Sequence, residues 1–502
     1  MTSGKADKAF KGVGELFLGQ VASKVFTFAF LIVFVRLLAR EELAILPLYY
    51  AVSGASTLLF SFGIPVTMIR EIPRLRVAEP EKMYSLLYTG FMVVIAGVFI
   101  SALLAILFEE QIQSLFFSSI GGHLEFKLIA SAMLVGGWKT LLTFILKSLQ
   151  MYRGMAIFTA SNDLLYRALG LAGFFIAGIN GLIAGFLLGT LITNLYCTWK
   201  LSPFIFKVKA WYPLHDLLRI SWPYYFEAYL HYFRAQGDVL IISSLLGASA
   251  LSVFFVAKRL YDLMMTLIAS MENVMAPSLS QLLGHSQEAA VAGYSRMTIL
   301  VSFAAIPMGL FAAGLSYSFI DVVGGSDYAR DAWLPAALYC GTTILHSLVA
   351  MKISAIYVFG NPADRLKITI SQFAVYFSLL YLLVMQFGIV GAPLAQIVSY
   401  ITASTYAGRL LSNVIGDRHV SKMVWVVLGS TIAGVLILVA LQMYYYAIFM
   451  LPVYLLAATL TALLLVSILL SGPDLQQVKE LLPSQLERSF SAYMKLRAKL
   501  PL

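Results

Sequence analysis

The sequence predicts an all-α membrane protein of about 14 transmembrane helices, arranged as two parallel six-helix repeats followed by two extra C-terminal helices. Composition is the first reason, because 60% of the 502 residues are hydrophobic and only 12% are charged. About 25% of a typical soluble domain is charged. Apolar runs long enough to cross ~30 Å of hydrocarbon recur along the chain, and the chain also contains an internal repeat.

The boundaries of the predicted helices follow the apolar runs. The expected spans are 13–38, 43–68, 85–108, 126–149, 155–177, 180–200, 219–245, 249–274, 296–320, 333–357, 366–387, 390–411, 423–446 and 449–471. They form an N-terminal lobe (1–200), a cytoplasmic linker (201–218), a C-terminal lobe (219–412), helices 13 and 14 (413–471) and a basic tail (472–502). We expect the tail either to lie on the anionic inner leaflet as an amphipathic helix or to stay solvated.

Two pairs of similar segments indicate the repeat. Residues 36–43 lie 208 positions before residues 244–251, and Gly178-Ile-Asn-Gly181 lies 210 positions before Gly388-Ile-Val-Gly391. Six is an even number of crossings, so both copies are expected to enter the membrane from the same side. Transporters built in this way place their substrate path between the repeats.

Basic residues concentrate in one set of alternate loops, and the opposite loops hold only Arg36, Arg40, Lys127 and Arg330. This asymmetry predicts that both termini are cytoplasmic. It also accounts for the net charge of +10, so we expect no nucleic-acid partner. Cys197 and Cys340 lie in apolar runs and indicate neither a disulfide framework nor a metal site.

Several charged residues interrupt the apolar runs. A charge at membrane depth costs at least ~2.5 kcal/mol, so it usually faces a cavity or a partner. Glu227, His231, Arg234 and Asp238 follow one another at steps of four, three and four, which places them on one face of helix seven. We expect this face to line a cavity; the alternative is a structural network in which Arg234 pairs with Asp238.

Lys24 and Lys139 have no acidic residue within one helical turn. Each is expected to meet water or an anionic ligand, unless an acid on another helix pairs with it. Lys24 falls two positions from the repeat equivalent of Arg234, so these two cations are expected to face each other between the halves.

Other charges have local partners in the sequence. Asp163 and Arg167 are four residues apart and are expected to form a structural pair. Among Lys258, Arg259 and Asp262 we expect one such pair, which leaves a cation for the cavity. Lys352 is expected to extend to the cytoplasmic interface, and His346 to be a hydrogen-bonded core residue.

Short motifs in the expected order resemble those of polysaccharide-biosynthesis membrane proteins, the Wzx-like flippases of the multidrug/oligosaccharidyl-lipid/polysaccharide exporter superfamily. They are Arg36-Leu-Leu, Gly63-Ile-Pro65, Arg70-Glu71, Pro223-Tyr-Tyr, Gly237-Asp238-Val-Leu-Ile, Tyr328 and Leu334 after Val323-Gly-Gly, Phe359-Gly-Asn and Phe387-Gly-Ile-Val-Gly-Ala392. The resemblance covers residues 13–412. Ala44-Ile45-Leu46 departs from it, because the family usually has an aromatic-Gly pair there.

The resemblance implies a MATE/MurJ-like V-shaped bundle in the cell membrane, coupled to H⁺ or Na⁺ and needing no other cofactor. With the charges, it predicts a transporter that flips a polyprenyl phosphate or diphosphate glycan to the outer leaflet for surface polysaccharide assembly. The expected cargo-binding residues are Lys24, Lys139, Arg234, Lys258 and Arg259. The expected cavity or ion-coupling residues are Glu227, His231, Asp238, Asp163 and Arg167. Polysaccharide polymerases or glycosyltransferases are expected partners.

Three alternatives remain open. A cation-coupled drug antiporter of the same superfamily would favour an acidic cavity, which the lysines oppose. A membrane glycosyltransferase would need acidic residues on an outer loop, where Glu109-Glu110 and Asp327 are the main candidates. A scaffold in an assembly complex would transport nothing. No G-x-x-x-x-G-K loop for ATP is present in the sequence, and we predict a transporter without catalytic residues.

Overall fold

A computed structural model describes residues 26–59, 61–117, 125–208, 210–283, 286–360, 362–415, 422–444 and 451–469. Every regular element within these ranges is helical. The chain divides into two compact units, Met1–Phe255 and Val256–Leu502. Lys24 and the predicted basic tail lie outside the described residues.

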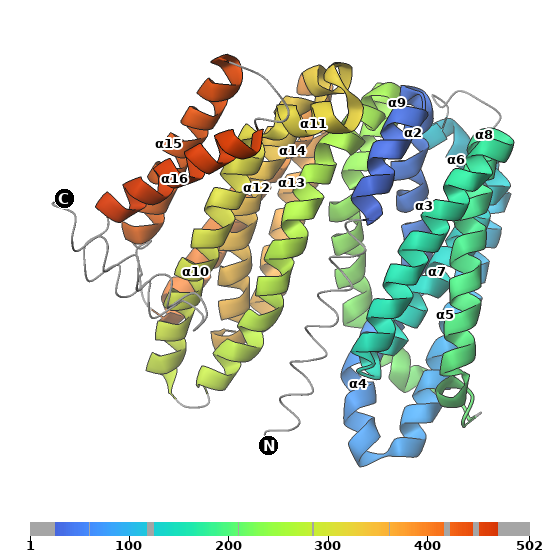
Figure 1. Cartoon of the computed structure of the whole chain (residues 1–502). Helices are drawn as coiled ribbons and strands as arrows, with labels where there is room; N and C mark the ends of the chain where they lie inside the picture. Colours follow the sequence, from blue (N-terminus) through green and yellow to red (C-terminus); the bar gives the residue numbers. More distant parts are fainter. Residues whose placement is uncertain are drawn as a thin grey trace. The chain divides into compact units, whose positions relative to one another are not determined.

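The first unit begins with a helix over Phe26–Leu37 (Figure 1). It continues with α2 (Arg40–Leu43), α3 (Ile45–Leu59), α4 (Ile64–Ala78), α5 (Pro80–Leu107), α6 (Glu109–Ile112), η1 (Gln113–Phe117), α7 (Phe126–Ser148) and α8 (Tyr152–Ile205). The division between the units falls inside the next helix, α9 (Leu214–Leu283).

The second unit holds the rest of the chain. Its elements after α9 are α10 (Gln287–Gly314), α11 (Ser316–Gly324), α12 (Ser326–Phe359), α13 (Pro362–Phe387), η2 (Gly388–Val390), α14 (Gly391–Ile415), α15 (Lys422–Tyr444) and α16 (Leu451–Leu469).

Among the described residues, eight helices are long and apolar enough to cross a membrane. Three of them each cover most or all of two predicted spans: 152–205, 224–265 and 364–412. At 54 residues, α8 would be about 80 Å long if it were straight, far more than one crossing needs. It breaks at Gly178, and α9 breaks at Gly247. The chain is a multi-pass membrane protein, and the total of fourteen crossings stays a prediction.

The same tight turn occurs in both halves of the repeat. Gly178 and Gly388 both have φ +59°, a conformation that residues with a Cβ rarely adopt. A Cβ on Gly181 would lie 2.0 Å from the carbonyl oxygen of Gly173, and a Cβ on Gly391 would lie 2.2 Å from that of Leu383. We call these turns the glycine hairpins; their shared geometry supports the repeat seen in the sequence.

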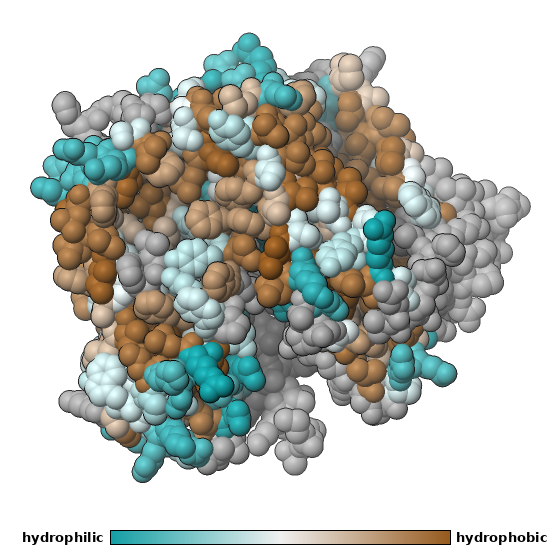
Figure 2. All heavy atoms as spheres, turned by 180° about the vertical axis from the view of Figure 1, so that it is seen from behind, coloured by the Kyte–Doolittle hydropathy of each residue, from teal (hydrophilic) through white to brown (hydrophobic). Residues whose placement is uncertain are grey.

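Apolar side chains lie on the surface as well as in the core. Phe175, Ile176 and Met443 are 71%, 86% and 83% exposed, which suits a surface that meets lipid. Figure 2 shows hydrophobic residues over much of one face. Inside the first unit, α4, α5, α7 and α8 share one apolar core, which includes Met68, Leu87, Leu142 and Leu201.

Candidate functional site

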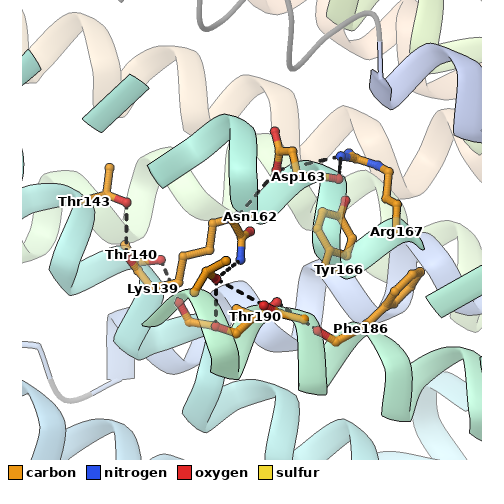
Figure 3. Close-up of polar contacts among 12 residues, drawn as sticks. Lys139, Thr140, Thr143, Asn162, Asp163, Tyr166, Arg167, Phe186 and Thr190 are labelled. Carbon is orange, nitrogen blue, oxygen red and sulfur yellow. Dashed lines mark hydrogen bonds and ion pairs between the residues drawn. The ribbon is translucent and has the colours of Figure 1, made fainter. Parts of the chain in front are cut away.

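A charged cluster lies where α7 meets the first half of α8 (Figure 3). Lys139 Nζ lies 3.7 Å from Asp163 Oδ1, and Arg167 Nη1 lies 3.8 Å from the same oxygen. Arg167 Nη1 also donates to the backbone carbonyl of Asp163 at 2.9 Å. One carboxylate is therefore shared by two cations, one from each helix.

Tyr166 supplies an aromatic face to both cations. The Arg167 guanidinium carbon lies 4.5 Å from the centre of the Tyr166 ring, and Lys139 Nζ lies 5.7 Å from it. These are cation–π distances. The Tyr166 hydroxyl lies 3.2 Å from that of Tyr50, and its ring makes an edge contact with Phe186 at 5.1 Å. The ring is therefore fixed from several sides.

The cluster is shielded but not sealed. The side chains of Lys139, Asp163 and Arg167 are 30%, 15% and 9% exposed. With one acid and two bases, the three side chains carry a surplus of one positive charge. Because the electrostatic attraction of an anion strengthens in a low-dielectric setting, this surplus favours a negatively charged group near the partly buried amine of Lys139.

Small residues and amides hold the cluster in place. A Cβ on Gly189 would lie 2.5 Å from the Cα of Tyr166, so the second half of α8 packs backbone to backbone against the first half. Asn162 Nδ2 donates to Thr193 Oγ1 at 2.8 Å across this contact. Asn194 Nδ2 donates to the Val135 carbonyl of α7 at 2.8 Å. Such close packing of small residues is typical of membrane helices.

The charged pair is present in only one half of the repeat. With the 210-residue offset of the glycine hairpins, Asp163 and Arg167 correspond to Phe373 and Phe377. These phenylalanines stack at 4.9 Å between ring centres. The residue before Arg167 is Tyr166, and its equivalent in the second half is also a tyrosine, Tyr376. The two tyrosines are 7% and 2% exposed. The repeat thus keeps the buried ring and replaces the ion pair by an aromatic pair.

The structure decides two of the alternatives for these residues. The predicted Asp163–Arg167 pair is confirmed. Lys139 is paired with an acid on another helix, which was the alternative to an unpaired lysine. Sequence spacing could not find this contact, because local periodicity relates residues within one helix and says nothing about which helices pack together.

On α9, the residues of the predicted stripe are described unevenly. Asp238 is 1% exposed, and its Oδ1 accepts a hydrogen bond from the Val239 N–H at 2.8 Å. Arg234 is half-buried. The side chains of Glu227 and His231 lie outside the described residues, as does Lys24.

Three residues singled out in the sequence of the second unit have defined contacts in the structure. Arg259 Nη1 lies 3.1 Å from Asp262 Oδ2, a spacing of three residues, so Asp262 pairs with at least one of the two neighbouring cations. The extension of Lys352 to the cytoplasmic interface stays a prediction; in the structure its amine donates to the carbonyl and hydroxyl oxygens of Ser404 at 3.0 and 2.8 Å. A neighbouring helix thus binds this lysine. The core assignment of His346 is confirmed, since its Nδ1 lies 2.9 Å from the Tyr400 hydroxyl.

Comparison with known proteins identifies the family to which the chain belongs. A family model described as polysaccharide biosynthesis protein matches residues 9–283, which is more than half of the sequence. The chain belongs to this family. A related protein of Haloferax volcanii, described as a probable low-salt glycan biosynthesis flippase, Agl15, is 22% identical over 429 residues. That alignment covers 84% of this chain and 88% of the relative.

Solved structures show the same fold. The lipid II flippase MurJ, in an inward closed conformation, superposes with a TM-score of 0.72 at 15% identity, covering 90% of this family member and 98% of MurJ. An inward-facing multidrug resistance MATE family transporter of the MOP superfamily gives a TM-score of 0.62 at 18% identity, covering 78% and 95%. The predicted all-helical membrane fold of the MATE/MurJ type is confirmed.

Proposed function

We propose that this protein flips a lipid-linked oligosaccharide, carried on a polyprenyl phosphate or diphosphate, from the cytoplasmic to the outer leaflet by alternating access. Membership of the polysaccharide biosynthesis family and similarity to Agl15, which is described as a glycan biosynthesis flippase, support this function. The lipid II flippase MurJ shares the fold.

The observation that carries the proposal is the surplus positive charge of the Lys139–Asp163–Arg167 cluster. Such a flippase must overcome two costs. Each unsatisfied glycan hydroxyl costs roughly 2–7 kcal/mol in an apolar medium, and the phosphate adds its own desolvation. A cation within the membrane-spanning helices offsets part of the second cost. We propose that Lys139, the most exposed of the three side chains, contacts the cargo phosphate, while Asp163 and Arg167 fix its position.

The remaining predicted residues keep their roles as proposals. Lys24 and Arg234 would hold the phosphate together with Lys139, and Lys258 or Arg259 would assist later in the passage. Asp238, Glu227 or Asp163 would bind a coupling ion, H⁺ or Na⁺. An inside-negative potential would also favour outward movement of the anion by ~2.3 kcal/mol per charge per 100 mV.

We place the protein in the cell membrane with both termini in the cytoplasm, following the distribution of basic loops. Flipped cargo must then be consumed on the outer face. A polysaccharide polymerase or a glycosyltransferase is therefore the proposed partner.

A reconstituted flipping assay tests the function. Proteoliposomes with lipid-linked glycan should transfer it between leaflets, and Lys139→Gln should slow transfer about tenfold, the equivalent of ~1.4 kcal/mol of lost interaction. Lys367→Gln is the matched control, because Lys367 is an exposed lysine paired with Asp364 in the second unit.

Three outcomes are informative. Loss of transfer in Lys139→Gln alone supports the site. Equal transfer by wild type and Lys139→Gln contradicts the role of Lys139 but leaves the function standing. Absence of glycan transfer by wild type, together with extrusion of a fluorescent organic cation, would replace the proposal by a drug antiporter.

A further inference from the structure

An aromatic patch with one lysine lies at the start of α5, away from the charged cluster. It consists of Tyr84 and Tyr88 of α5 together with Phe206, Lys207 and Trp211 of the segment that follows α8. We name these five residues the aromatic–lysine patch.

The lysine lies on an aromatic ring. Lys207 Nζ lies 4.3 Å from the centre of the Tyr84 ring and donates to the Tyr84 hydroxyl at 3.1 Å. One turn along α5, the Tyr88 ring makes edge contacts with Trp211 at 5.6 Å and with Phe206 at 6.3 Å. Rings from two segments that are distant in the sequence therefore pack together one helical turn from the Tyr84–Lys207 contact.

The patch is held rigidly. The backbone N–H of Tyr212 donates to the buried hydroxyl of Thr89 at 2.7 Å, and Phe91 packs against Phe206 at 5.8 Å. Because the segment after α8 is tied to α5 on both sides of Lys207, the geometry exists before any ligand binds. A preformed site loses less entropy on binding.

The charge of Lys207 is available to a ligand. Within the described residues, its contacts are with Tyr84, and no carboxylate lies within ion-pair distance. The nearby Lys82 is instead paired with Glu79. Lys207 is exposed and Trp211 is 62% exposed. The patch therefore presents one unneutralised cation beside an open indole ring.

Its depth matches the headgroup layer. α5 begins at Pro80 with the charged residues Glu81 and Lys82 and carries no further charge as far as its end at Leu107, so the patch lies where the span meets water. Trp and Tyr are enriched at that level because their rings are apolar and their edges polar. Lys200, about two helical turns earlier, repeats the pattern, since its amine lies 4.9 Å from the Trp199 ring. The second lysine adds positive charge to the same edge of the unit.

We propose that the aromatic–lysine patch is a binding site for the headgroup of an anionic phospholipid from the surrounding leaflet. Lys207 would bind the phosphodiester, and Trp211 and Tyr88 would cover the glycerol and the first acyl carbons. The site is separate from cargo transport and does not depend on the proposed flippase function.

Native mass spectrometry of the purified full chain tests the site by counting retained lipids. We expect wild type to retain phosphatidylglycerol in preference to phosphatidylcholine. Lys207→Gln and Trp211→Ala should each weaken this retention about fivefold, since a lysine near an anionic membrane surface contributes about 1 kcal/mol. Lys207→Arg should preserve it, and Lys367→Gln serves as the unaffected control.

Several results would overturn the proposal. Equal retention of the two phospholipids by wild type, or undiminished phosphatidylglycerol in both Lys207→Gln and Trp211→Ala, would show that the patch is only part of a non-selective aromatic belt. Stronger retention of a polyprenyl phosphate than of phosphatidylglycerol would assign the patch to cargo. Circular dichroism and gel filtration confirm that each variant is folded before lipids are counted.

Discussion

Lys139 Nζ lies 3.7 Å from Asp163 Oδ1, so α7 and α8 are joined by an ion pair inside the membrane-spanning part of the first unit. Arg167 reaches the same oxygen. One acid held by two bases ties the two helices together, and the surplus positive charge is the part that we propose for the cargo phosphate.

Removing the acid should harm the fold more than removing one base. Asp163→Asn leaves two neighbouring cations facing each other, whereas Lys139→Gln leaves a satisfied Asp163–Arg167 pair. We expect the melting temperature in detergent to fall further for Asp163→Asn. The double variant Asp163→Asn/Arg167→Gln should lose less than the two single losses added together, because contacting residues are coupled by about 0.5–3 kcal/mol. Additive losses would contradict the shared ion pair.

Replacing the charged pair of the first unit by the aromatic pair of the second should leave the protein folded and slow transport. Asp163→Phe/Arg167→Phe places in α8 the pair that α13 carries at the equivalent positions, Phe373 and Phe377. We expect gel filtration to show a folded protein and the flipping assay to show a loss of about tenfold or more. The control at the equivalent positions of the second unit, Phe373→Leu/Phe377→Leu, should retain flipping. Full flipping by the first double variant would show that the ion pair has no part in transport.

The second glycine of each hairpin, Gly181 or Gly391, should tolerate no side chain. In Gly181→Ala the new Cβ would lie 2.0 Å from a backbone oxygen, which requires the backbone to move and costs about 1–3 kcal/mol or more. Gly391→Ala should behave alike, because its hairpin has the same geometry. Gly341→Ala, with nothing within 4 Å of the new Cβ, should be neutral or stabilising by up to about 1 kcal/mol. Thermal unfolding followed by gel filtration gives the melting temperature of each of the three variants. Equal melting temperatures for all three would contradict the predicted clash at Gly181 and Gly391.

The effects of substituting Lys352 and Ser404 on the free energy of unfolding should be coupled. Ser404→Ala removes one of two acceptors of a partly buried ammonium group and should cost about 1 kcal/mol. In a Lys352→Met background the same change should cost almost nothing, because no charge is left to satisfy. Thr405→Ala, whose hydroxyl bonds within its own helix, is the control. A double-mutant cycle by thermal unfolding gives the coupling; a value near zero would favour a lysine that reaches water instead.

The fold was largely predictable from the sequence. Apolar run length gives the spans and the connectors at Gly178 and Gly388, and the two Gly-x-x-Gly motifs indicated the repeat that these matching turns support. The contacts of charged residues were predictable only within one helix, as for Asp163 and Arg167. The Lys139–Asp163 and Lys352–Ser404 contacts join separate helices, and side-chain spacing along a chain carries no information about them. The aromatic–lysine patch was missed for the same reason, since its members come from residues 84–88 and 206–211.

The glycine hairpins also limit how the molecule can move. Each joins two helices whose backbones touch, so lengthwise sliding would bring a residue with a Cβ to the place where only glycine fits against a carbonyl oxygen. We therefore expect the two helical segments of α8, before and after Gly178, to move together as a rigid pair, and α13 to move with α14 in the same way. Distance measurements during turnover should find a constant separation between the two segments of α8, and likewise between α13 and α14.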